Sequence, residues 1–109
     1  MQFHFQTGDV TFFEEDKEYF EKRLQPLKKF LGSTLDTADK NAINLTIKIA
    51  KNKHSSGNRF ESSATMICPL HGTFHAETEA ENIKKCADGL QDSLKKQIRR
   101  AKEKMGHSL

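Results

Sequence analysis

The chain has 109 residues, of which 35% are hydrophobic and 30% are charged, and its formal net charge is +3. This length allows one modest core and excludes two, and no apolar run approaches the roughly 20 residues that a membrane-spanning helix needs. Two cysteines are too few for a disulfide framework, and the opening residues alternate instead of forming a signal peptide. We therefore expect a single cytoplasmic domain, with an ordered core over about 1–105 and a short tail over 106–109.

A strand and a helix are predicted first along the chain. Residues 2–6 alternate apolar and polar side chains, which is typical of a short strand. Residues 11–32 have the spacing of an amphipathic helix, with Thr11 and Glu14 as a candidate capping box. Pro26 lies inside this helix and removes a backbone hydrogen bond, so it is predicted to kink or split the last turns. The apolar stripe of the helix consists of Phe13, Phe20, Leu24, Leu27 and Leu31.

Three strands and a second helix are predicted to follow. Residues 43–49 alternate, a second strand covers about 59–69, and the turn "PLHG" leads into a third strand, "TFHAET". Thr78 and Glu81 form another candidate capping box, at the start of a long helix. The apolar stripe of that helix consists of Ile83, Ala87, Leu90, Leu94, Ile98, Ala101 and Met105. The predicted core contains Ile47, Ala64, Met66, Leu90, Leu94 and Ile98.

These elements predict an α+β fold with the order β-α-β-β-β-α. No internal repeat or low-complexity tract interrupts the order. Because each element has a single apolar side, the economical arrangement is a four-stranded antiparallel sheet with the two helices packed on one face.

The second predicted helix carries an excess of positive charge. From residue 83 to residue 105, eight basic residues oppose three acidic ones, while the rest of the chain is close to neutral. Such an asymmetric basic face predicts a polyanionic partner, and the phosphates of an RNA backbone match it. Exposed aromatic side chains are scarce, which favours structured RNA over single strands. The basic residues of this face are Lys95, Arg99 and Lys102 in one row, Lys96 and Arg100 on the outer side, and Lys22, Arg23, Lys28 and Lys29 on the first helix.

Catalytic and metal sites are not favoured by the sequence. The chain has no Gly-rich phosphate loop, no Gly-x-Ser-x-Gly elbow and no pair of carboxylates in a buried setting, so we do not expect an enzyme. Cys68, His71, His75 and Cys86 include the residue types of zinc ligands. Because Cys68 and His75 fall on opposite faces of the predicted sheet, we expect no metal and no cofactor, and both cysteines are predicted to pack in the core.

Two stretches resemble a known family. The opening "MQ", the helix "KEYFEKRLQPLKKFL" and above all "ADGLQDSLKKQIRRAKEKM" are similar to the short ribosome hibernation promoting factor and ribosome-associated inhibitor family. Members of this family end the domain with an Asp, an apolar residue, a Leu, an Arg-Gln-Leu run and alternating lysines. The chain ends at "GHSL", and in this it resembles the short promoting factor.

The resemblance implies a function that depends on binding and involves no catalysed reaction. Such proteins bind the small ribosomal subunit in the channel for messenger and transfer RNA, block translation under stress or in stationary phase, and preserve idle ribosomes. The implied partners are ribosomal RNA and a second hibernation factor for ribosome pairing, and the implied state off the ribosome is a monomer. By this resemblance the first candidates for RNA contacts are Lys96, Arg100, Lys102 and Lys104, followed by Lys22, Arg23, Lys28 and Lys29.

Two alternatives remain open at this point. A free-standing double-stranded RNA-binding module has a helix, three strands and a helix, an order contained within the one predicted here. The leading strand "QFHFQ" argues against such a module, whereas Lys84 and Lys85 at the start of the last helix favour it. A zinc-dependent interaction module is the other alternative, and metal analysis of the purified protein distinguishes it.

Overall fold

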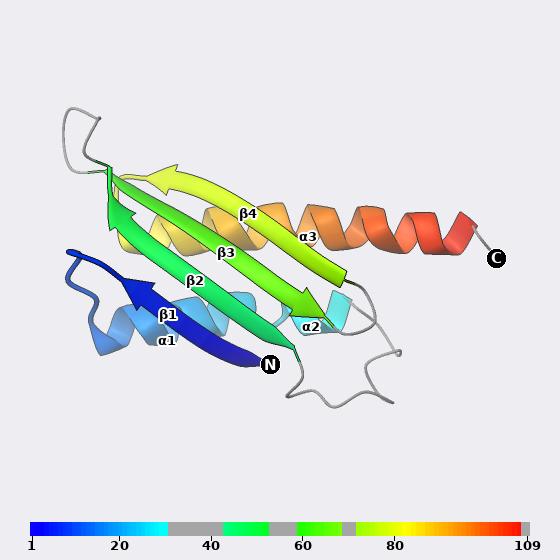
Figure 1. Ribbon diagram of the computed structural model, residues 1–109, viewed down its shortest axis with the longest axis horizontal. Helices are drawn as coiled ribbons and strands as arrows, with labels where there is room; N and C mark the ends of the chain where they lie inside the picture. Colours follow the sequence, from blue (N-terminus) through cyan, green and yellow to red (C-terminus); the bar gives the residue numbers. More distant parts are fainter. Residues whose placement is uncertain (31–42, 53–58, 69–71, 108–109) are drawn as a thin grey trace.

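The computed structural model describes residues 1–30, 43–52, 59–68 and 72–107, with side chains as far as residue 104. The expected turn "PLHG" and the helix stop at Gly32 fall largely outside the described residues. The elements, drawn in Figure 1, are β1 (Gln2–Thr7), α1 (Glu14–Leu24), α2 (Leu27–Phe30), β2 (Asn44–Lys51), β3 (Phe60–Cys68), β4 (Gly72–Ala80) and α3 (Ile83–His107). This order confirms the predicted α+β fold.

The four strands form one sheet in the order β1-β2-β3-β4. Strands β2, β3 and β4 are antiparallel neighbours, whereas β1 runs parallel to β2, with Phe5 opposite Ile47. The expectation of an antiparallel sheet is therefore wrong at this one pair. The physical reason is the connection, because α1 and α2 carry the chain back along the sheet before β2 begins, as a crossover between parallel strands must.

Within the described ranges, the helices α1, α2 and α3 all lie on one face of the sheet (Figure 1). The core fills the space between the two layers, and the strands contribute the alternate side chains that point toward the helices. All six predicted core residues have no exposed surface: Ile47, Ala64, Met66, Leu90, Leu94 and Ile98. The other face of the sheet carries the alternate, polar side chains, among which Ile67 is an exposed exception.

The first predicted helix is split as Pro26 predicts, since α1 ends at Leu24 and α2 begins at Leu27. It begins later than expected, at Glu14, and the backbone N–H of Phe13 donates to Asp16 Oδ2 over 3.0 Å. Phe13 therefore precedes the helix and is 61% exposed. The ring of Phe12 takes the place in the core that the sequence pattern assigns to Phe13, with ring centroids 5.3 Å from Phe5 and 5.8 Å from Phe20.

The long helix α3 also begins later than expected. Thr78 lies within β4, so it does not cap the helix; instead Asn82 Oδ1 accepts a hydrogen bond from the backbone N–H of Lys85 over 2.8 Å. Thr78 packs against the helix at Gly89, where a Cβ atom would lie 2.5 Å from the threonine Oγ1. A glycine in the middle of this helix thus allows α3 to approach β4 closely.

Leu94 tests the packing of α3 against the sheet. Its side chain is fully buried, so we expect Leu94→Ala to lower the free energy of unfolding by about 2–5 kcal/mol, the usual cost of emptying a leucine site. Chemical denaturation measures this loss. Arg99→Ala, at an exposed position of the same helix, is the control and should change stability by no more than about 0.5 kcal/mol. Equal losses in the two variants would contradict the assigned face.

Candidate nucleic-acid interface

The helix α3 presents two different faces because its apolar residues recur with the helical period. Leu90, Leu94 and Ile98 point into the core, so the residues between them point to solvent. Figure 1 shows that the last turns of α3 run past the start of β4, so that the end of this helix projects beyond the sheet. The molecule is correspondingly elongated, with extents of 49 × 25 × 17 Å.

Three of the predicted RNA-binding residues are engaged within the protein. Arg23 Nε lies 2.9 Å from Asp88 Oδ1, which joins α1 to α3. Lys96 forms an ion pair of 3.1 Å with Asp92, one turn earlier on α3. The ammonium of Lys95 lies 5.1 Å from the centroid of the Phe30 ring, a cation–π contact between α3 and α2.

Four other predicted residues form a free basic group on the projecting end of α3. All four are exposed, and within the described ranges no carboxylate lies at ion-pair distance from any of them. At 100° per residue they span an arc of about 200° around the helix, interrupted by a single acid, Glu103. We call these residues the α3 basic arc: Arg99, Arg100, Lys102 and Lys104.

The helix macrodipole does not account for the whole α3 basic arc. Cations are favoured at the C-terminal end of a helix, but the effect falls off within the last turn. Because α3 extends to His107, Arg99 and Arg100 lie about two turns before its end. So many like charges on one short segment are an arrangement that a polyanionic ligand would neutralise.

The lysines of the first two helices differ in their position relative to α3. Lys22 and Lys29 are exposed, while Lys28 is half-buried. α2 packs against α3, which places Lys28 and Lys29 on an element adjoining the basic helix. Lys28 and Lys29 therefore adjoin the basic helix, whereas Lys22 lines a hollow with Met1 and Phe3 on the β1 side of α1.

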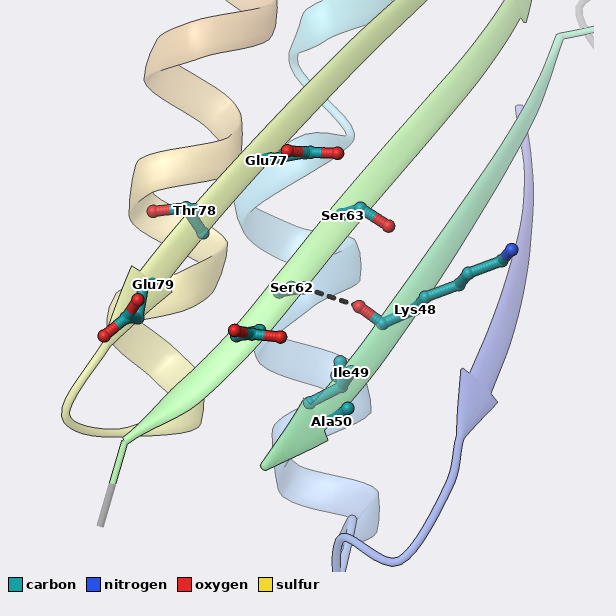
Figure 2. Close-up of a pocket in the computed structure, with 9 residues that line it drawn as sticks. Lys48, Ile49, Ala50, Ser62, Ser63, Glu77, Thr78 and Glu79 are labelled. Atoms are coloured by element: carbon teal, nitrogen blue, oxygen red, sulfur yellow. Dashed lines mark hydrogen bonds between the residues drawn. The ribbon is translucent and has the colours of Figure 1, made fainter. Parts of the chain in front are cut away.

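The open face of the sheet has a different character. Lys48, Ser63 and Glu77 form one cross-strand row, and Figure 2 shows these side chains around an open hollow on this face. Glu61 and Glu79 form the next row, and Arg59 pairs with Glu79 over 2.6 Å. Three acids thus stand against two cations in these rows, and this face does not extend the basic surface.

The three candidate zinc ligands that the structure describes, Cys68, His75 and Cys86, do not converge. Cys68 and Cys86 are buried free thiols, whereas His75 is exposed on the open face, and His71 lies outside the described residues. Over the ranges that the structure describes, no group of three or more metal-ligating side chains converges. Burial raises the pKa of both thiols to about 11, which keeps them neutral near pH 7.

One residue to which sequence reasoning assigns no role has a clear one. Gln97 Nε2 donates to the backbone carbonyl of His75 over 2.6 Å, and its Oε1 accepts from the backbone N–H of His75 over 3.3 Å. The amide thereby occupies backbone groups at the outer edge of β4, as a further strand would. The available signal is the position of Gln97 in Lys96-Gln97-Ile98, where the family that the chain resembles has an Arg-Gln-Leu run.

Comparison with models of protein families shows the family to which the chain belongs. Residues 3–106 match the model of the family described as sigma 54 modulation protein / S30EA ribosomal protein, and the chain belongs to this family. This confirms the family that the sequence resembles. No curated protein sequence matches the chain.

Two solved structures share the fold. A ribosomal subunit interface protein from Coxiella burnetii is 21% identical, with a TM-score of 0.71 over 94% of this chain and 99% of its own. The N-terminal domain of Protein Y from Thermus thermophilus is 15% identical, with a TM-score of 0.70 over 92% of this chain and 98% of its own. At these identities the likeness establishes the fold.

In the described part of the chain, no helix is long and apolar enough to cross a membrane.

The two buried thiols give a prediction about reactivity. Because the thiolate is the reactive form, a thiol with a pKa of about 11 should be alkylated at pH 8 roughly 100-fold more slowly than an ordinary cysteine. We expect the native protein to resist alkylation and both cysteines to react once denaturant is added, as followed by mass spectrometry. Rapid labelling of the native protein would contradict the assigned burial.

Proposed function

We propose that this protein is a ribosome hibernation factor of the cytoplasm. It binds the small ribosomal subunit in the channel for messenger and transfer RNA, blocks translation under stress or in stationary phase, and preserves idle ribosomes. The observation that carries the proposal is the α3 basic arc, a group of exposed and unpaired cations on the projecting end of one helix. Family membership and the shared fold of a ribosomal subunit interface protein support it.

The mechanism that this surface supports is that the protein occupies the RNA channel and catalyses no reaction. Arginine and lysine side chains on a rigid helix neutralise backbone phosphates, and this fixes the position of the protein without reading a base sequence. The guanidinium groups of Arg99 and Arg100 can each donate two parallel hydrogen bonds to a phosphate, whereas Lys102 and Lys104 act as point charges. A body of this length, held in the channel by such contacts, excludes other RNA ligands by volume.

The test replaces part of the α3 basic arc. In the variant Arg100→Gln, Lys102→Gln and Lys104→Gln, we expect binding to small subunits to weaken strongly. The slope of log affinity against log salt should become shallower by roughly one unit for each phosphate that the variant no longer neutralises. Sedimentation with purified small subunits at several salt concentrations measures both quantities. Thermal unfolding should change little, because the replaced side chains are exposed.

A matched variant separates position from net charge. Lys17, Lys48 and Lys51 are exposed and lie outside the proposed interface, so replacing all three by Gln removes the same formal charge. This control should keep nearly the full affinity and salt slope. Equal losses in the two triple variants would contradict an interface on α3.

Competition decides between this function and a general module for double-stranded RNA. The proposed factor should prefer small subunits to an RNA duplex of arbitrary sequence, and messenger and transfer RNA should displace it. Equal affinity for duplex and subunits, with no displacement, would instead favour the general module. The leading strand β1, paired with β2 in the sheet, argues against that module.

A further inference from the structure

A small polar cluster joins the two main helices away from the α3 basic arc. The hydroxyl of Tyr19 donates to Asp88 Oδ1 over 2.8 Å, and Arg23 Nε forms an ion pair of 2.9 Å with the same oxygen. The ammonium of Lys84 lies 5.9 Å from the centroid of the Tyr19 ring. Tyr19 and Arg23 are one turn apart on α1, and Lys84 and Asp88 are one turn apart on α3, so two adjacent pairs face each other across the helix contact.

Stability does not explain this cluster well. The side chain of Arg23 is 50% exposed and that of Asp88 is 41% exposed, and ion pairs at such positions contribute little to folding. On a surface that binds a polyanion, a carboxylate also has an electrostatic cost, because it repels phosphate. The presence of Asp88 on this surface therefore requires an explanation other than the direct effect of its charge on phosphate.

The geometry of the arginine supplies that reason. The ion pair with Asp88 is formed through Nε, the inner nitrogen of the guanidinium, and among the described residues the two terminal nitrogens of Arg23 make no hydrogen bond. A long side chain that is already ordered loses less conformational entropy when it binds. Holding the inner nitrogen thus presents the terminal N–H groups of Arg23 in a fixed direction, from which a phosphate can accept two hydrogen bonds.

We propose that Asp88 is a positioning residue for RNA binding, which acts by holding Arg23 ready for a phosphate and by fixing α1 against α3. This inference rests on the proposed function. It assigns to an acidic residue a favourable effect on binding to a polyanion, opposite in sign to the effect of its charge alone. Tyr19, one turn earlier than Arg23 on α1, donates to the same carboxylate oxygen and keeps it in place.

The cluster can be observed in solution through its tyrosine. The hydrogen bond to Asp88 raises the pKa of Tyr19, burial raises it further, and the nearby Arg23 lowers it. The chain contains one tyrosine and no tryptophan, so the absorbance of tyrosinate reports on this residue alone. Asp88→Asn should lower the pKa of Tyr19 and Arg23→Gln should raise it, and an unchanged pKa in both variants would contradict the cluster.

Binding of Asp88→Asn to purified small subunits tests the positioning role. We expect affinity about two- to tenfold weaker than that of the unaltered protein, the range for losing one pre-ordered side chain. Asp92→Asn is the matched control, because Asp92 is another exposed acid on α3, one turn further on, and pairs with Lys96. Its loss frees a cation, so this control should bind equally well or more tightly.

The double variant shows whether Asp88 acts through Arg23. When Arg23 is already Gln, the further change Asp88→Asn should no longer weaken binding and should leave it unchanged or strengthen it. Tighter binding by Asp88→Asn alone, or the same loss in both backgrounds, would overturn the inference. If the unaltered protein itself fails to bind subunits, the proposed function fails instead, and the two failures are thereby distinguished.

Discussion

The burial of one stripe of α3 is the constraint on which both the fold and the candidate interface depend. α3 packs against β4 and β3, and the removal of Leu90, Leu94 and Ile98 from water is the main contribution of this helix to stability. Because successive residues of a helix are separated by 100°, fixing these three side chains fixes the direction of every other one. The cations of α3 therefore point to solvent as a consequence of packing, and the helix serves the core and the surface together.

Much of the fold could be predicted because its periodic signals are strong. The alternation in β2 and the stripe of α3 each identify an element and its buried face. The parallel direction of β1 could not be read from periodicity, since a strand has the same pattern in either direction. Phe12 and Phe13 illustrate a second limit: both are apolar neighbours, and only contacts with Phe5 and Phe20, which lie on other elements, select which ring is buried.

The sequence predicts which basic residues form the candidate interface, but it does not predict which of them are paired with other side chains. The spacing of Asp92 and Lys96 already indicates an ion pair on one helix face. The partnership of Arg23 with Asp88 has no such signal, because it joins residues on different helices through tertiary packing alone. The structure therefore divides one predicted group of ten basic residues into those held by the protein and those of the α3 basic arc, with the lysines of α2 adjoining α3 and Lys22 on the β1 side of α1.

The elongated shape separates the charges along the longest axis of 49 Å. One end holds the acidic first turn of α1 and, where β3 begins and β4 finishes, Glu61 and Glu79; the other holds α2 and the last turns of α3 (Figure 1). Because the α3 basic arc lies at one end of the molecule, the field of a polyanion exerts a torque that turns this cationic end inward during the diffusional encounter. Alignment of this kind precedes any contact and weakens as salt shortens the Debye length.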